Sequence, residues 1–238
     1  MLLSGASLLA GSSAVAAPPV GPLAVELFTS QGCSSCPPAD LQLGKLARRP
    51  DIVALSFHVD YWDYIGWKDR FASKETTARQ RAYARTLKQR YVYTPEMVVD
   101  GRAHEPGTSV GPIEGLLAEA RRQSAKRTTP ELTRTADGAL IVRLAAATLA
   151  GGPADVTVFA YDRRHSTPVR RGENDGRMLE NFNVVRHFEI VSRWDGTEQH
   201  WTVPSDRFQP DQGIAVLVQR ADHGPVLGAA KLESLAAG

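Results

Sequence analysis

The segment that decides the fold is VELFTSQGCSSCPPAD, at Val25–Asp40. A short apolar run ends in a glycine-containing turn, and Cys33 and Cys36 then stand three residues apart where a helix is about to begin. They are the only two cysteines of the chain. A bridge between them would close almost no loop and would constrain the unfolded chain very little. The pair is therefore a poor structural staple, and its spacing indicates a chemical role.

The residues around this segment predict a βαβ unit. Apolar strands are expected at Pro22–Thr29 and Ile52–Val59, with a helix between them that ends near Arg49, before Pro50. Such strands are parallel, with a right-handed crossover, so they end at the same edge of the sheet. This topology predicts that Cys33 lies near His58 and Asp60.

The next stretch predicts an aromatic, irregular segment and further elements of an α/β domain. Residues 61–70 are rich in tryptophan and tyrosine, and a helix is expected from Ser73 to about Arg90. A strand at 97–99, a hairpin turn at 100–101 and a helix at 111–123 follow. Trp62 and Trp67 would either line a groove over the cysteines or fill the core.

Beyond a polar linker that ends at Pro130, the pattern changes from helical to alternating. Turn signals separate several of the short strands expected here, which favours a small β-sandwich. These strands are expected at 132–134, 139–144, 156–161, 184–191, 200–203 and 214–219. Residues 172–177 have the composition of a turn, although Glu173, Asn174 and Arg177 offer groups that bind a ligand.

The composition and the first residues of the chain limit which partners and which cellular compartment we expect for the protein. The 28 basic and 26 acidic residues nearly balance, so nothing global points to nucleic acid, and after residue 20 no apolar run is long enough for stable membrane insertion. Met1–Ala17 is uncharged, leucine- and alanine-rich, and ends in a small-x-small cleavage site, although it lacks the usual basic start. We expect a signal peptide at 1–17 and a periplasmic or secreted protein.

A strand that leads into Cys33-x-x-Cys36 at a helix start, followed by Thr94-Pro95 before a strand, resembles the thioredoxin superfamily. The Val25–Asp40 segment, Tyr61–Asp69, Tyr93-Thr94-Pro95 and Arg171–Arg177 are similar to an uncharacterised family of secreted bacterial thioredoxin-like proteins, a domain of unknown function. The resemblance implies a cis peptide bond before Pro95, packed beside the cysteines, with Thr94 binding the extended chain of the substrate. The long insert between Asp60 and Pro95 and the Ser34-Ser35 pair depart from well-studied oxidoreductases.

Together these observations predict an α/β thioredoxin-like domain with a helical insert at 22–125, followed by a β-sandwich-like domain at 130–238. The predicted function is thiol–disulfide exchange with a protein or a small molecule that carries a thiol or disulfide, and a redox partner protein is possible. Cys33 is the expected nucleophile, because sulfur ahead of a helix meets its partial positive charge, and Cys36 is the resolving thiol. Pro37 disfavours a helical Cys36, and a helix that began only at Pro38 would assist Cys33 less.

Other residues and functions stay open on the sequence alone. Glu26 is either a buried acid that moves protons during exchange or a paired structural acid. Thr94, Pro95 and Trp62 are expected to bind the substrate. The redox function needs no metal or other cofactor. The alternatives are a soft-metal module for copper delivery, in which His58 joins the two sulfur atoms, and a binding protein without catalytic activity.

Overall fold

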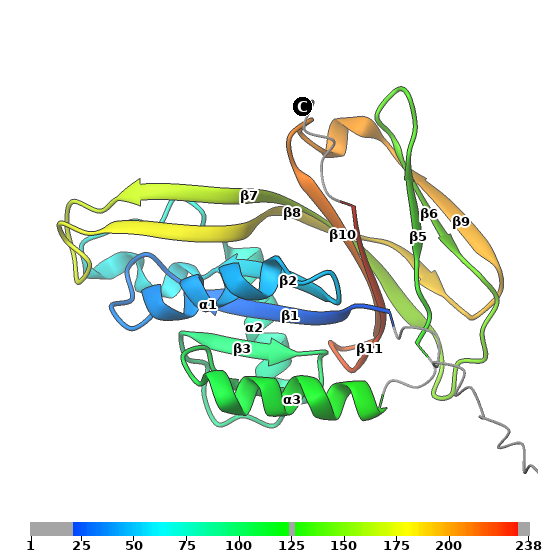
Figure 1. The fold of residues 1–238 in the computed structure, drawn as a ribbon, viewed down its shortest axis with the longest axis horizontal. Coiled ribbons are helices and arrows are strands. Elements are labelled where there is room, and N and C mark those ends of the chain that lie inside the picture. The colour runs from blue at the N-terminus through cyan, green and yellow to red at the C-terminus, as the bar shows by residue number, and fades with distance from the viewer. Residues whose placement is uncertain (1–20, 124–126, 233–238) are drawn as a thin grey trace, which may run out of the picture.

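The computed structural model describes residues 21–123 and 127–232 and has a mixed α/β architecture (Figure 1). An eight-stranded mixed sheet runs in the order β11-β10-β7-β8-β2-β1-β3-β4, and β5-β6-β9 form a separate antiparallel sheet. The predicted signal peptide lies outside the described residues. In the first half of the chain the elements are β1 (Leu23–Thr29), α1 (Pro37–Ala47), β2 (Ile52–His58), η1 (Asp60–Ile65), α2 (Lys74–Thr86), β3 (Glu96–Val99), β4 (Ala103–Pro106) and α3 (Val110–Gln123).

The predicted βαβ unit is confirmed. Strands β1 and β2 are parallel, with their pairing running from Leu23 opposite Ile52 to Thr29 opposite His58. All residues of both strands are buried, because helices cover both faces of the sheet here. Apolar residues of α1 and α3 pack on one face, and Tyr83 of α2 packs on the other.

The second helix is shorter than the sequence predicts. Ser73 caps α2 as expected, in a reciprocal arrangement with Thr76. The helix ends at Thr86, however, and not near Arg90. Lys88 has φ 56°, in the left-handed region that ends helices, so the chain leaves the helical path there.

The hairpin predicted at residues 100–101 joins β3 to β4. Asp100 and Gly101 have φ of 54° and 64°, as a tight hairpin turn of this kind requires. A Cβ on Gly101 would also lie 2.4 Å from the carbonyl oxygen of Gly224, so glycine serves both the turn and a close approach.

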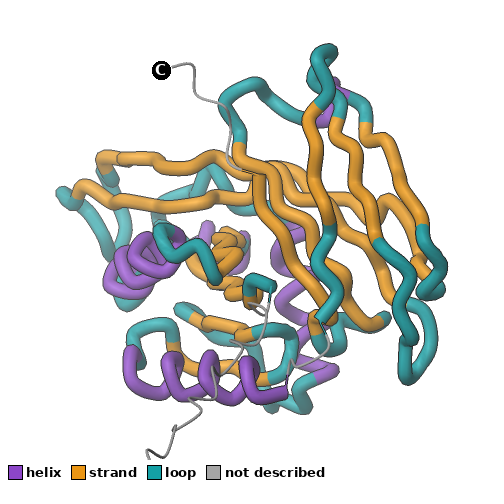
Figure 2. Tube along the Cα trace, turned by 45° about the vertical axis from the view of Figure 1, so that its right-hand side comes forward, coloured by secondary structure: helices purple, strands orange, loops and turns teal. Residues whose placement is uncertain are grey.

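The second half of the chain extends the main sheet and adds the small one (Figure 2). Strand β8 joins β2 through Ser56 opposite Val184, so strands from both sides of residues 124–126 share one sheet. The three-stranded sheet packs against β7 and β10, as in a sandwich, around Trp194 and neighbouring aliphatic residues. The elements are β5 (Glu131–Arg134), β6 (Leu140–Leu144), β7 (Ala154–Pro168), β8 (Met178–Trp194), β9 (Gln199–Val203), η2 (Ser205–Arg207), β10 (Gly213–Arg220) and β11 (Val226–Leu232).

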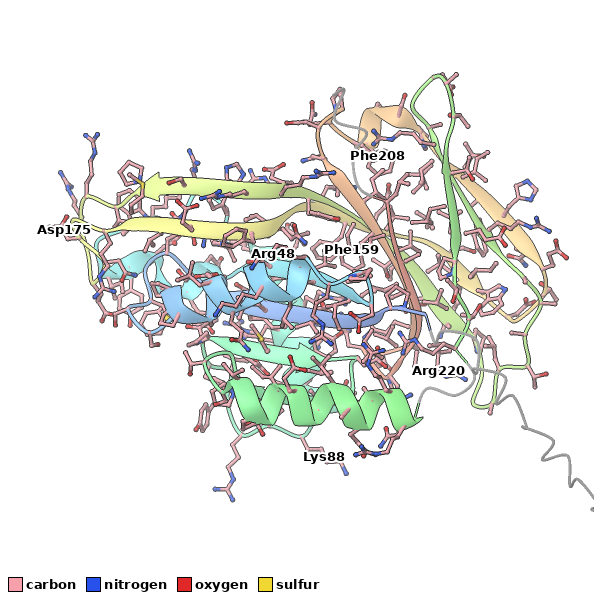
Figure 3. All side chains as sticks on the ribbon, in the orientation of Figure 1. Arg48, Lys88, Phe159, Asp175, Phe208 and Arg220 are labelled. Atoms are coloured by element: carbon pink, nitrogen blue, oxygen red, sulfur yellow. A yellow bond between two sulfur atoms is a disulfide. The ribbon has the colours of Figure 1, made fainter. Side chains whose placement is uncertain are left out.

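The hairpin of β7 and β8 decides what surrounds the cysteines. The two strands have 15 and 17 residues, far longer than expected from their apolar runs. The outer half of β8 runs alongside α1, where Gly44 of the helix faces the ring of Phe182, and the turn that joins β7 to β8 lies beyond the end of the helix (Figure 1). Asp175 marks this turn (Figure 3). Among the described residues, no helix is long and apolar enough to cross a membrane.

Candidate functional site

Cys33 and Cys36 form a disulfide in the turn between β1 and α1, with 5.4 Å between their Cα atoms. The Cys33 N–H donates to the carbonyl of Ser30 at 3.1 Å, which tightens the turn. Both cysteines are buried, with exposed fractions of 1% and 0%. Ser34 and Ser35 between them are exposed, and the Ser35 hydroxyl lies 3.3 Å from the Cys33 sulfur.

The start of α1 differs from what is expected of a helix that follows a reactive cysteine. The helix begins at Pro37, and Cys36 has helical angles of φ −78° and ψ −36°, although a following proline disfavours them. Pro37 and Pro38 have no N–H, so the first turn presents fewer donors than usual. The N–H of Asp40 donates to the carbonyl of Cys36 at 3.1 Å. The helix therefore offers Cys33 less stabilisation of negative charge than the spacing alone suggests.

The peptide bond between Thr94 and Pro95 is cis, as the resemblance implied. Glu96, the next residue, pairs with Phe28 near the end of β1, so the proline lies at the strand end from which the cysteine turn begins. Trp62 connects the two segments. Its indole N–H donates to the Thr94 hydroxyl at 2.7 Å, and a Cβ on Gly32 would lie 3.2 Å from the Cβ of Trp62. Thr94, Pro95 and Trp62 thus border the turn, while their binding of substrate stays a prediction.

Glu26 is not brought to the cysteines. Side chains alternate along a strand, and Glu26 points to the face of β1 opposite α1. There it is 1% exposed and forms an ion pair with the buried Arg79 at 2.5 Å, while the Tyr83 hydroxyl also donates to it. Although burial opposes it, the Glu26 carboxylate raises the pKa of Arg79, and burial raises the pKa of Tyr83. These contacts favour the paired structural acid over the proton carrier.

A different acid, Asp40, lies in the first turn of α1, directly after Cys36, the N-cap residue of that helix. It stands four residues after Cys36, and because Cys36 itself has helical angles the two side chains are expected on the same side of the helix start. Asp40 is buried and accepts a hydrogen bond from the Thr29 hydroxyl at 3.2 Å. Burial raises the pKa of Asp40 from 3.8 to about 7, with Thr29 and His58 opposing the shift. Asp40 was not among the site residues predicted from the sequence, although its four-residue spacing from Cys36 on a predicted helix was the available signal.

His58 lies at the sheet edge near the cysteines, as the topology predicted, and forms a buried pair with Asp69. Its Nδ1 is 2.6 Å from Oδ2 of Asp69, and both side chains are 0% exposed. Burial alone would lower the pKa of His58, but the Asp69 carboxylate outweighs this and raises it. Asp69 also accepts from the N–H of Gln31, two residues before Cys33, at 2.8 Å. Asp60, predicted at the same edge, accepts instead from Thr77 of α2 at 2.6 Å.

Within residues 21–123 and 127–232, no group of three or more His, Cys, Asp or Glu side chains is arranged to hold a metal ion. The hypothetical ligand set of His58 with both sulfur atoms is therefore not assembled in the disulfide form. Instead, Nδ1 of His58 forms a hydrogen bond with the carboxylate of Asp69.

Two residues from the second half of the chain, Glu173 and Asn174, form hydrogen bonds to the cysteine turn. From the sequence these residues were only candidates for binding a ligand. The side-chain amide of Asn174 donates to the carbonyls of Gln31 and Cys33, both at 2.9 Å. Oε2 of Glu173 accepts from the N–H of Ser34 at 3.1 Å. The sequence contained no signal for these contacts, which join residues about 140 positions apart.

Gln31 links the hairpin, the turn and the aromatic segment. Its amide donates to Oδ1 of Asn181 in β8 at 2.9 Å and accepts from the indole of Trp67 at 3.1 Å. Trp67 therefore belongs to the wall of the cysteine turn. Asn181 and Gln31 were not recognised in the sequence, because polar residues of this kind carry no spacing pattern.

Comparison with known proteins identifies relatives of the chain. The model of a family described as "Protein of unknown function (DUF1223)" matches residues 24–219. A crystal structure of a protein from Agrobacterium tumefaciens is 34% identical, with a TM-score of 0.81, and the match covers 93% of this chain and 98% of that one. HBP35 of Porphyromonas gingivalis is 14% identical with a TM-score of 0.58, over 92% of this chain and 78% of that one, and shares the fold alone. No curated protein matches the chain.

Proposed function

We propose that this chain, which belongs to the DUF1223 family of proteins of unknown function, is a thiol–disulfide oxidoreductase of thioredoxin-like type that uses Cys33 and Cys36. The observation that carries the proposal is the combination of a disulfide at a helix start with a cis peptide bond before Pro95 at the same end of β1. The resemblance to the thioredoxin superfamily implies the same combination.

The exchange begins from the disulfide form of the protein. A substrate thiolate attacks Sγ of Cys33, which forms a mixed disulfide and releases the Cys36 thiolate. A second substrate thiolate then attacks the substrate sulfur of the mixed disulfide and releases the Cys33 thiolate. Two substrate thiols are thereby oxidised to one disulfide, and the protein is reduced to a dithiol. The reverse sequence reduces a substrate disulfide, and the direction depends on the potentials of the two couples.

Asp40 supports this chemistry as a proton carrier for Cys36. A group accepts and releases protons most effectively when its pKa is near the working pH, and burial brings the pKa of Asp40 to about 7. In the reducing direction, Asp40 would take the proton of the Cys36 thiol as that sulfur attacks the mixed disulfide. Its position one helical turn after Cys36 makes it the better candidate for this role than Glu26.

The setting that we propose is the periplasm or the exterior of a cell, following the expected signal peptide. An oxidising compartment maintains disulfides. The partner is then a molecule that carries a thiol or a disulfide, and a second redox protein would restore the starting state of the pair.

The proposal is tested by trapping the mixed disulfide. The reduced Cys36→Ser variant is incubated with cystamine, a small disulfide, and examined by mass spectrometry. We expect one adduct on Cys33, because the variant lacks the thiol that would resolve it. In the presence of a reductant, the wild-type protein should catalyse the reduction of cystamine, and Cys33→Ser should not. Absence of the adduct together with absence of catalysis would overturn the proposal.

A further inference from the structure

The hairpin tip, defined as residues 170–177 between β7 and β8, lies directly on the cysteine turn. Asn174 is only 1% exposed, although it belongs to the end of a projecting hairpin. Its side-chain amide donates hydrogen bonds to the carbonyls of Gln31 and Cys33, the residues on either side of Gly32. The carboxylate of Glu173 accepts a hydrogen bond from the N–H of Ser34. The peptide groups on either side of Cys33 are therefore already bonded within the chain.

The tip also contacts the aromatic segment on the other side of the turn. Gly172 has φ 76°, and a Cβ there would lie 3.2 Å from the carbonyl oxygen of Ile65 and 3.3 Å from the Cβ of Trp67. A side chain at this position would push the tip away. Glycine thus allows the hairpin tip to close against the segment that borders the cysteines.

This arrangement has a consequence for the substrate. Thiol–disulfide exchange requires the incoming sulfur to reach Sγ of Cys33, yet the residue is 1% exposed. An extended polypeptide bound along Thr94 would gain further affinity by bonding to free backbone groups beside the reactive cysteine. Here the carbonyl of Cys33 already accepts a hydrogen bond from Asn174, and the N–H of Ser34 already donates one to Glu173. Ser34 and Ser35, between the buried cysteines, are exposed, and a small molecule needs far less opening than a protein chain.

We infer that Glu173 and Asn174 are specificity-determining residues that hold the hairpin tip over the cysteine pair, and that the site exchanges with small thiols or disulfides and excludes polypeptides. The inference rests on the proposed function for its biological meaning. It narrows the substrate from proteins and small molecules together to small molecules alone.

The test measures reduction of the protein's own disulfide and needs no turnover. Dithiothreitol serves as the small dithiol and a reduced thioredoxin as the protein dithiol, and alkylation with mass detection reports the fraction reduced. The test variant is Glu173→Ala/Asn174→Ala. The matched control is Asp175→Ala, which removes a carboxylate from the same tip, where the side chain of Asp175 has no hydrogen bond within the described residues.

We expect the double variant to accelerate reduction by thioredoxin about tenfold or more, since each of the three hydrogen bonds lost between the tip and the turn contributes about twofold to tenfold to a conformational equilibrium. Reduction by dithiothreitol should change much less, and the control should leave both rates nearly unchanged. Equal acceleration with both reductants, or no acceleration in a folded double variant, would overturn the inference.

A second measurement on the wild-type protein avoids any folding defect of the variants. We expect thioredoxin to reduce the wild-type disulfide no faster than dithiothreitol does at equal concentration, and faster reduction by thioredoxin would also overturn the inference. The proposed function fails separately, through loss of the Cys33 adduct and of cystamine turnover, because accessibility of the disulfide to a reductant does not depend on catalysis.

Discussion

Replacement of Asp40 by asparagine is expected to change the stability of the protein in a way that depends on pH. The amide matches the protonated carboxyl in shape and carries no charge. In the folded protein burial raises the pKa of Asp40 from 3.8 to about 7. A carboxyl with a raised pKa favours folding when it is protonated, so its contribution is fully present at low pH and is lost as the pH rises from about 4 to about 7.

The magnitude follows from the size of this shift. Asp40 is 3% exposed, so solvent screening reduces the effect little. A difference of about three pH units corresponds to about 4 kcal/mol of unfolding free energy, at about 1.4 kcal/mol per unit. Relative to the wild type, Asp40→Asn should therefore gain stability steadily between about pH 4 and pH 7. Above pH 7 the difference should be constant.

The assay is urea unfolding of the oxidised wild-type and variant proteins from pH 4.5 to pH 8.5, in about one-unit steps. Taking the difference removes the titrations that both proteins share. The control is Asp51→Asn, since Arg49 and Arg121 outweigh partial burial and hold the pKa of Asp51 below its usual value. This control should lose stability by an amount that hardly changes between pH 4.5 and pH 8.5, because a carboxyl with a lowered pKa loses its contribution only below about pH 4. A flat difference for Asp40→Asn would refute the assignment of a raised pKa to Asp40.

Two further predictions concern packing and buried charge. Arg79→Met should destabilise the protein by about 3–5 kcal/mol in urea unfolding, because Glu26 is left as an unpaired buried charge, and adding Glu26→Gln should recover much of the loss. A single-variant loss below about 1 kcal/mol would contradict the importance of this pair. Gly44→Ala should cost about 1–3 kcal/mol, because the new Cβ would lie 2.6 Å from the ring of Phe182, whereas Gly115→Ala meets nothing within 4 Å and should stabilise α3 slightly. Equal effects of the two glycine substitutions would contradict this packing argument.

The local part of the fold was readable from the sequence. The apolar strands around the cysteines and the proline after the first helix predict the βαβ unit, and β1 and β2 pair accordingly. The cis bond before Pro95 followed from the resemblance, because bond geometry of this kind is a family feature and not a consequence of composition. His58 reached the expected sheet edge for the same topological reason.

The contacts between distant segments were not readable. Strand β8 joins β2 at Ser56, and the β7–β8 hairpin then carries Asn174 to the cysteine turn, but neither step leaves a periodic pattern. The sequence drew attention to Glu26 because a charge in an apolar strand is conspicuous. Which face of the strand it occupies depends on register and on the position of Arg79 in α2, which only the assembled fold provides.

The central claim is that Cys33 and Cys36 are a redox-active pair, and their reduction potential tests it most directly. The protein would be equilibrated in glutathione buffers of known potential, and alkylation would give the fraction reduced. The bridge joins residues three apart, so it gains little from loop closure. We predict a potential above about −300 mV, in the range of about −270 to −120 mV found for thiol–disulfide oxidoreductases. A value below about −300 mV, typical of structural disulfides, would contradict the account.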